Sequence, residues 1–315
     1  MLLNDPVRMN AYRSAIQRTV HAGDVVLDVG SGSGILALFA CQAGAARVYC
    51  VELGPIIEVA RQLAAVNGFG DRIRFLREDA LRVELPEKVD VIQSELIGKS
   101  ALGEAMSEIL DHCRDRFLKT DGRMLPGEVT LRIAPVESSA AWAKSRLPDP
   151  SAYDLNFAPM QQLSDNLTTS QFIPSDSLLA SGQIAYSYRA IGADNRDVFD
   201  ALLEFRPSRS GVLHGFVAWF SAELAEGVTL TNAPPGISSW DHNFFPLPTP
   251  VPVESKSSIQ LRLSARSDTK FAEAWNWRTV VEQDQAKIAQ FEQSSFRGSL
   301  NLQEQVRKTL RAKRS

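Results

Sequence analysis

The strongest indication of the fold is in the stretch of residues 26–36, Val26-Leu27-Asp28-Val29-Gly30-Ser31-Gly32-Ser33-Gly34-Ile35-Leu36. Its first four residues belong to an apolar run, and such a run is typical of a strand that is buried on both faces. Three glycines, Gly30, Gly32 and Gly34, then allow the backbone to turn tightly and to approach a ligand without obstruction by side chains. The apolar residues that follow predict a helix that ends at Gly44. We therefore expect a strand, a ligand-binding glycine loop and a helix, in this order.

Strands and helices alternate through the first part of the chain. Apolar runs predict further strands at residues 47–52, 73–76, 89–94 and 122–126. The segments between or before them predict helices at residues 9–21, 55–67 and 102–118. Alternation of this kind is typical of an α/β domain, in which helices cover both faces of a parallel sheet. We expect this domain to span residues 1–127.

The pattern changes near Val129. From there to Arg278, short segments of alternating polarity predict the antiparallel strands of a sandwich or barrel, and we place this second domain at residues 128–278. Residues 142–179 are polar and carry four prolines, so we interpret them as an excursion and a candidate oligomer contact. The glutamine, glutamate, lysine and arginine content of residues 279–315 predicts a helical or flexible C-terminal extension.

The composition limits the classes of protein that the chain belongs to. With 44% hydrophobic and 23% charged residues, the chain resembles a globular protein that buries a core. A formal net charge of −3 argues against a strongly basic nucleic-acid-binding protein. The three cysteines and four histidines show no metal-ligand spacing, so we expect no metal site. We see no signal peptide and no apolar run of about 18 residues, so we expect a cytoplasmic protein without a membrane span.

An acidic residue ends the second predicted strand. Glu52 lies 18 residues after Gly34, and a carboxylate at this point accepts hydrogen bonds from both hydroxyls of a ribose. Dinucleotide-binding enzymes use the same device, so Glu52 indicates a nucleoside without specifying which one. Their glycine pattern is G-x-G-x-x-G, however, and the chain has Ile35 where the third glycine would stand. A second acidic residue, Asp79, follows the third predicted strand and precedes Ala80.

The G-x-G-x-G spacing resembles the first motif of class I S-adenosylmethionine-dependent methyltransferases. The resemblance implies that the loop from Asp28 to Gly34 faces the amino-acid part of S-adenosylmethionine. It also implies that Asp79, with Ala80 beside it, meets the adenine amino group. The cofactor product would then be S-adenosylhomocysteine.

Two glutamates flank the loop after the fourth predicted strand. Glu95 lies just beyond that strand, at the edge where α/β sheets bind ligands, and Glu104 follows nine residues later at the start of a helix. Two carboxylates brought together would clamp a guanidinium, which donates two parallel hydrogen bonds to each carboxylate. Such a clamp would hold one nitrogen in line with a methyl donor and lower the entropic part of the barrier. Alternatively, Glu104 is only a charge favoured by the dipole at the helix N-terminus.

This segment is similar, in its spacing and its Ser-Glu-x-x-Gly opening, to the double-glutamate loop of protein arginine methyltransferases. The likeness extends to residues 1–13, where the family's arginine, Arg8 here, pairs with the cofactor carboxylate. It also extends to Ser238-Ser239-Trp240, where the family has a Thr-His-Trp loop. The resemblance implies a Rossmann-like domain followed by a β-barrel, with Ser239 and Trp240 at the substrate. The implied acceptor is an arginine in a protein or peptide, or a small guanidino metabolite, and the implied assembly is a homodimer.

Several positions depart from the family pattern. The sequence starts at the motif after the family's usual first helix, so we expect another element or a neighbouring subunit to close over the cofactor. Ser239 replaces a histidine that pairs with an aspartate at the position of Asp5, and a minority branch that makes symmetric dimethylarginine also has serine there. Leu96 and Lys99 replace aromatic residues of the double-glutamate loop. If Lys99 points inward, it would repel a guanidinium and favour a different acceptor.

Three functions therefore stay open. The first is methylation of an arginine or guanidino nitrogen, with the acceptor held by Glu95 and Glu104. The second keeps the cofactor but transfers the methyl group to a nitrogen or oxygen of another small molecule. The third is a cofactor-binding regulatory or scaffold protein without catalysis. His242, three residues after Ser239, is a further candidate to replace the missing loop histidine.

Overall fold

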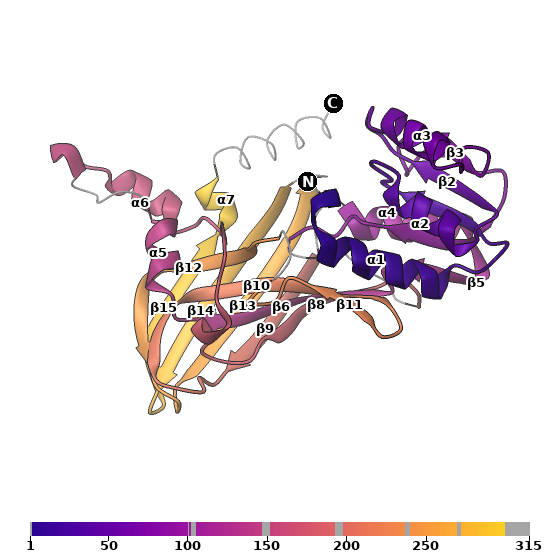
Figure 1. Ribbon diagram of the computed structural model, residues 1–315. Helices are drawn as coiled ribbons and strands as arrows, with labels where there is room; N and C mark the ends of the chain where they lie inside the picture. The colour runs from indigo at the N-terminus through magenta and orange to yellow at the C-terminus, as the bar shows by residue number, and fades with distance from the viewer. Residues whose placement is uncertain are drawn as a thin grey trace.

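A parallel sheet with its helices is followed by two antiparallel sheets, and the predicted fold class is confirmed (Figure 1). The parallel half lies at one end of the molecule in indigo and purple, and the antiparallel sheets lie at the other end in orange and yellow (Figure 1). The computed structural model describes residues 2–99, 101, 105–146, 152–192, 198–236, 240–269 and 272–299.

The parallel sheet reverses its strand order next to the glycine loop. Its strands are β1 (Val25–Val29), β2 (Arg47–Val51), β3 (Ile73–Leu76), β4 (Val89–Ser94) and β5 (Leu118–Leu125). They lie in the order β3-β2-β1-β4-β5, and every neighbouring pair is parallel. The chain thus proceeds outward from β1 in one direction, then returns to β4 and proceeds in the other. Open α/β sheets bind ligands outside the carboxyl ends of their strands at such a switch point.

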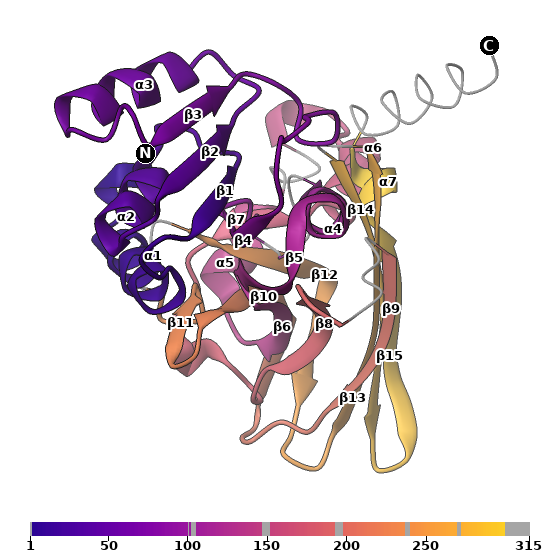
Figure 2. The same cartoon turned by 90° about the vertical axis from the view of Figure 1, so that its right-hand side faces the viewer.

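Four α-helices accompany this sheet in the described part of the chain: α1 (Pro6–Thr19), α2 (Ile35–Ala43), α3 (Ile57–Val66) and α4 (Met106–Phe117). Figure 2 shows α2 and α4 on opposite sides of β1 and β4. Helix α1 begins three residues earlier than the sequence predicts. The reason is that Asp5 caps it by accepting the Arg8 amide hydrogen bond at 3.0 Å, and proline stands at its first position. None of the described helices is long and apolar enough to cross a lipid bilayer.

Two antiparallel sheets make up the second half of the chain. The first has the order β7-β12-β10-β6-β8, with β11 beside β10, and the second has the order β15-β14-β13-β9. Aromatic side chains join the two sheets, because Phe245 of β12 packs edge-on against Trp275 and Trp277 of β14. The distances between the ring centroids are 5.3 and 5.4 Å. The strands are β6 (Glu128–Val136), β7 (Thr169–Gln171), β8 (Gln183–Arg189), β9 (Val198–Phe205), β10 (Gly211–Ala225), β11 (Val228–Thr231), β12 (His242–Val253), β13 (Ser258–Thr269), β14 (Ala272–Gln283) and β15 (Ala286–Ser294).

The excursion predicted at residues 142–179 is helical in part. It contains α5 (Ser139–Ser145) at its start, which packs against β12, and α6 (Ala158–Ser164), which projects beyond the edge of the antiparallel sheets (Figure 1). It returns to the sheet at β7, which pairs with β12. Short 3₁₀ turns lie at the start of the chain and within the excursion, at Leu2–Asn4, Ala152–Asp154 and Ser175–Ser177.

The prediction of a helical or flexible extension from residue 279 is wrong for residues 279–294. Strand β14 continues to Gln283, and β15 pairs with it as far as Ser294, before the short helix α7 (Ser295–Gly298). The sequence misled because β15 is an edge strand, whose outward side chains are polar and whose structure depends on its single neighbour. In β14, by contrast, Thr279 and Val281 are buried on the inner face. Residues 300–315 lie outside the described residues.

Gly215 provides a test of how closely β10 and β12 approach. A Cβ atom at this position would overlap the Phe245 carbonyl oxygen and lie 3.0 Å from the Phe244 ring. We expect Gly215→Ala to lower the free energy of unfolding by about 1–3 kcal/mol, because neither neighbour can move without disturbing the sheet.

Chemical denaturation checks this prediction, with Gly70→Ala as the matched control. A Cβ atom at Gly70 would lie 3.7 Å from Ala65, an ordinary contact, so its unfolding free energy should change by less than about 0.5 kcal/mol. Equal stability of the two variants would contradict the close approach.

Candidate functional site

A cleft of ≈ 400 Å³ opens at the carboxyl edge of the parallel sheet. Five of the residues predicted from the sequence line it together, and they come from the segments that follow β1, β2, β3 and β4: Gly30, Glu52, Asp79, Ala80 and Glu95. The remaining lining residues are mostly apolar: Val29, Val51, Leu53, Glu78, Leu96, Ala105 and Ile109. The cleft therefore has the polar rim and apolar walls that suit a nucleoside.

The Glu52 carboxylate is held in the cleft by backbone amides. Its Oε2 accepts a hydrogen bond from the Gly32 amide at 3.0 Å, and its Oε1 accepts one from the Gly54 amide at 2.6 Å. Each carboxylate oxygen has a second lone pair, so both oxygens can still accept from hydroxyl donors. The glycine loop and the end of β2 thus fix the carboxylate that the sequence assigns to a ribose.

Two of the three loop glycines allow close approaches between different elements. All have positive φ angles, 67° at Gly30, 54° at Gly32 and 77° at Gly34. A Cβ atom at Gly30 would lie 2.9 Å from the Leu96 side chain at the cleft, whereas one at Gly34 would lie 2.9 Å from Ala60 of α3. Gly30 therefore allows the loop after β4 to lie against the glycine loop, and Gly34 allows α2 to pack against α3.

Asp28 is buried beneath the glycine loop and does not line the cleft. Its side chain is 0% exposed, and neither carboxylate oxygen makes a hydrogen bond of standard geometry with a described residue. Burial raises the pKa of Asp28 from 3.8 to about 7, and the nearby Gln93 side chain, Ala37 amide and Ser31 hydroxyl offset only part of that rise. The sequence pointed to Asp28 as a cofactor ligand, although the apolar run around it is consistent with this burial.

The Arg8 guanidinium lies between Glu95 and Trp240. Arg8 Nη1 is 3.6 Å from Glu95 Oε2, and the central carbon of the guanidinium is 3.1 Å from the centroid of the Trp240 ring. A further ion pair joins Arg8 Nε to Asp5 Oδ2 at 3.7 Å, and the Trp240 ring rests edge-on against Phe220. Arg8 is only 7% exposed. A carboxylate and an indole thus form a binding place for a guanidinium beside this cleft.

Other predicted residues lie elsewhere. Glu104 and Ser239 lie outside the described residues, so the clamp of two glutamates stays a prediction. Lys99 is exposed, and its ammonium donates a hydrogen bond to the Ser170 hydroxyl at 2.9 Å. His242 is buried, which lowers its pKa, and its Nδ1 accepts the Ile173 amide hydrogen bond at 3.0 Å. These contacts place His242 within the antiparallel sheet.

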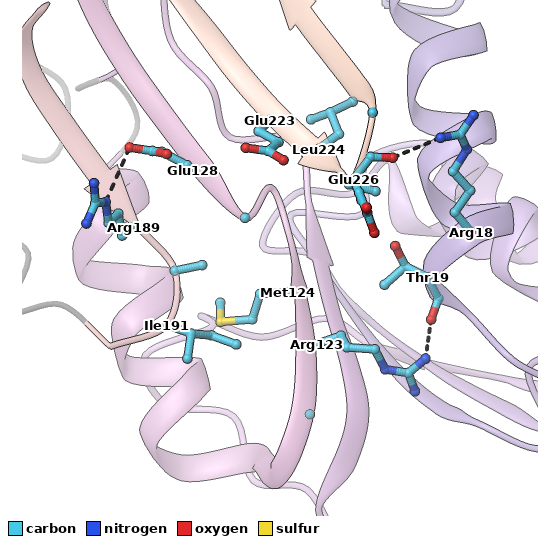
Figure 3. A pocket seen from close by; sticks show the side chains of 15 residues that line it. Arg18, Thr19, Arg123, Met124, Glu128, Arg189, Ile191, Glu223, Leu224 and Glu226 are labelled. Carbon is cyan, nitrogen blue, oxygen red and sulfur yellow. Dashed lines mark hydrogen bonds and ion pairs between the residues drawn. The ribbon is translucent and has the colours of Figure 1, made fainter.

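A second and larger cavity, of ≈ 980 Å³, lies between the end of α1, β5 and the β10–β11 turn (Figure 3). None of the predicted site residues lines it. Its arginines already have partners, because Arg18 donates to the Glu226 carbonyl at 2.8 Å, Arg189 pairs with Glu128 at 3.3 Å and Arg123 donates to the Thr19 carbonyl (Figure 3). We assign no chemistry to this cavity.

The raised pKa of Asp28 gives a prediction about stability. Between about pH 4 and pH 7, the folded protein keeps the Asp28 proton while the unfolded chain loses it, so rising pH favours unfolding. An asparagine side chain at this position cannot titrate. We therefore expect Asp28→Asn to become more stable relative to the wild type as pH rises through this window, by up to about 4 kcal/mol.

Urea unfolding of both proteins at several pH values from 4 to 8 measures this difference. A stability difference that stays constant, or that shrinks as pH rises, would show that the Asp28 carboxyl is not kept protonated by its surroundings.

Two family models together match most of the chain. One, described as ribosomal protein L11 methyltransferase, matches residues 13–125, and the other, described as PRMT5 oligomerisation domain, matches residues 133–300. Among curated relatives, the chain is 30% identical to an arginine N(omega)-methyltransferase of Streptomyces achromogenes subsp. streptozoticus over 274 residues, which are 83% of this chain and 74% of the relative. It is 45% identical to the protein arginine N-methyltransferase PRMT10 of Oryza sativa subsp. japonica, over 49% of this chain and 41% of the relative.

Solved structures show the same architecture. Protein arginine methyltransferase 10 of Arabidopsis thaliana superimposes with a TM-score of 0.80 at 25% identity, over 93% of this chain and 95% of the other. A Trypanosoma brucei PRMT1 enzyme-prozyme complex with AdoHcy matches in fold, with a TM-score of 0.86 at 21% identity, over 93% of this chain and 95% of the other. The protein arginine N-methyltransferase 6 of Xenopus laevis is 30% identical over 82% of this chain and 80% of its own length. The chain therefore belongs to the protein arginine methyltransferase family.

Proposed function

We propose that the protein transfers a methyl group from S-adenosylmethionine to a guanidinium nitrogen of arginine. The observation that carries this proposal is the position of Arg8, whose guanidinium lies against both Glu95 and Trp240. Glu95 also lines the cleft at the carboxyl edge of the parallel sheet. One carboxylate therefore borders both the predicted cofactor cleft and a place whose chemistry suits a guanidinium.

The residues of the cleft fit S-adenosylmethionine. Glu52 is fixed by two backbone amides and keeps lone pairs for the ribose hydroxyls, while Asp79 and Ala80 lie on the wall where the adenine would bind. The absence of a side chain at Gly30 lets the loop with Glu95 lie close to the glycine loop. When bound, the cofactor would supply an electrophilic methyl group on a sulfonium centre.

Glu95 would bind and orient the acceptor. Its carboxylate would accept hydrogen bonds from the acceptor guanidinium and hold one nitrogen toward the methyl group, which lowers the entropic part of the barrier. That nitrogen would form the new bond to the methyl carbon as the carbon–sulfur bond breaks and S-adenosylhomocysteine leaves. The proton of this nitrogen would pass to solvent, and the carboxylate would stabilise the positive charge throughout. Glu104 is the proposed second carboxylate, and Ser239 is proposed to contact the acceptor beside Trp240. For the acceptor to enter, Arg8 would leave Trp240 and pair with the cofactor carboxylate.

The acceptor is either a protein arginine or free arginine. Several relatives are named protein arginine N-methyltransferases, whereas the Streptomyces relative is named an arginine N(omega)-methyltransferase. The latter name favours a small guanidino compound as the second candidate. Methyl-labelled cofactor incubated with free arginine and, separately, with arginine-rich peptides distinguishes them. Labelled methylarginine appears directly in the first reaction, or after acid hydrolysis of the peptides in the second. Absence of label from both would contradict the proposed activity.

The excursion at 142–179 is the proposed contact for a homodimer. Large apolar side chains are exposed along it, among them Tyr153 at 84%, Leu155 at 61% and Phe172 at 58%. Exposed apolar side chains gathered on one segment mark a protein contact. The match of residues 133–300 to a family model described as an oligomerisation domain supports the same assignment. A monomer by light scattering at micromolar concentration would contradict it.

Glu95→Gln tests the acceptor site. We expect methyl transfer to fall by about 10²-fold or more, because a neutral amide keeps the shape but cannot stabilise the guanidinium charge. The dissociation constant of S-adenosylhomocysteine should change by less than about threefold. The complex of enzyme and S-adenosylhomocysteine contains no acceptor guanidinium, and the amide keeps the shape of the side chain.

The matched control for this prediction is Glu108→Gln, which neutralises an exposed glutamate on α4 outside the cleft. It should transfer methyl groups at the wild-type rate. If Glu95→Gln also turned over at the wild-type rate, Glu95 would not bind the acceptor.

A further inference from the structure

The Lys99 side chain joins the loop that carries Glu95 to the antiparallel sheet. Lys99 Nζ donates a hydrogen bond to Ser170 Oγ at 2.9 Å, and Ser170 Oγ donates to Asp241 Oδ2 at 3.0 Å. Lys99 lies four residues after Glu95, and Asp241 directly follows Trp240. A lysine, a serine and an aspartate from three separate segments therefore form one hydrogen-bonded chain.

The sheet end of this chain is held by the surrounding structure. Ser170 lies in β7 and faces Asn243 of β12 in the strand register. The Asp241 carbonyl accepts a hydrogen bond from Asn232 Nδ2 at 3.1 Å, and Asn232 is buried and also accepts the Phe220 amide at 2.8 Å. Ser170 and Asp241 thus have fixed positions, and Lys99 connects the Glu95 loop to them.

The hydrogen bonds of Lys99, Ser170 and Asp241 join the same two parts of the protein that form the two sides of the guanidinium site. Glu95 belongs to the loop after β4 of the parallel sheet, whereas Trp240 precedes β12 of the antiparallel sheet. The Arg8 guanidinium lies between them. The two sides must therefore be placed so that a guanidinium meets the carboxylate with its N–H groups and the indole with its face. Lys99, from the loop that carries Glu95, bonds directly to the opposite sheet.

We propose that Lys99, Ser170 and Asp241 are positioning residues that set the spacing between Glu95 and Trp240. We call these three hydrogen-bonded residues the interdomain latch. Only its expected effect on turnover rests on the proposed function. The contact with Ser170 also turns the Lys99 ammonium toward the antiparallel sheet, so its charge serves the latch. Because all three side chains are exposed, added salt weakens the electrostatic part of the latch.

Lys99→Met tests the latch through the kinetics of the acceptor. We expect the KM of the acceptor to rise by about two- to fivefold, which is the range for loss of an exposed charged contact, while the dissociation constant of S-adenosylhomocysteine stays unchanged. Raising sodium chloride from 50 to 500 mM should bring the wild-type acceptor KM toward that of the variant. The variant should show a smaller rise in KM with salt than the wild type, because in both proteins salt still screens the pairing of the acceptor with Glu95.

Lys256→Met is the matched control, because Lys256 is an exposed lysine paired with Asp284 at 3.0 Å in another part of the protein. Its acceptor KM and its salt response should equal those of the wild type. The charge-reversed pair Lys99→Asp with Asp241→Lys should recover more of the acceptor affinity than either single change. A Lys99→Met variant with wild-type acceptor KM, or with weaker cofactor binding to the same degree, would overturn the proposal.

A measurement that needs no turnover separates the latch from the proposed function. Melting temperatures of Lys99→Met, Asp241→Asn and the double variant form a cycle, and we expect the double variant to lose less than the sum of the single losses. Additive losses would overturn the latch even if methyl transfer were intact. Absence of methyl transfer by the wild type, with non-additive melting, would instead overturn the proposed function and leave the latch supported.

Discussion

The parallel pairing of β1 with β4 is the constraint on which the rest of the site depends. The register sets Val29 opposite Ser94, and the Ser94 hydroxyl donates a hydrogen bond to the Val29 carbonyl at 2.9 Å. Gly30 and Glu95 each follow directly, so the first glycine of the glycine loop and the proposed acceptor-binding carboxylate emerge side by side. The same place is the switch point of the strand order, where both loops diverge and leave a cleft.

Helix α1 and the antiparallel sheet complete the site around this pair of strands. The Tyr12 hydroxyl donates to the Ser94 carbonyl at 3.1 Å, so the helix that carries Arg8 is tied to the end of β4. Trp240 reaches the same point from the other sheet and covers the Arg8 guanidinium. The polar groups proposed to bind cofactor and acceptor are therefore positioned by both the parallel and the antiparallel parts of the protein.

The sequence predicted the parallel half well, because each of its strands and helices carries a local signal. An apolar run, a glycine loop and an acidic residue after a strand are enough to assign Gly30, Glu52 and Glu95 to one edge of a sheet. The edge strand β15 was missed, because its polar side chains take their structure from pairing with β14 and not from a local pattern.

Long-range contacts were beyond what the sequence could predict. No spacing indicates that Arg8 rests on Trp240, that Lys99 bonds to Ser170, or that Leu96 abuts Gly30, because each contact depends on how separate elements pack. Lys99 departs from the family pattern, and the sequence predicts repulsion of a guanidinium only if Lys99 points inward. Its ammonium instead bonds to Ser170. The fold thus follows from local patterns, whereas the acceptor site follows from packing.

The most direct measurement is a crystal structure of the protein with S-adenosylhomocysteine and an arginine acceptor. We expect the acceptor guanidinium to lie against Glu95 and Trp240, with one nitrogen facing the cofactor sulfur, and Arg8 to have moved to the cofactor carboxylate. An acceptor bound elsewhere, with the Arg8 guanidinium still between Glu95 and Trp240, would contradict this expectation.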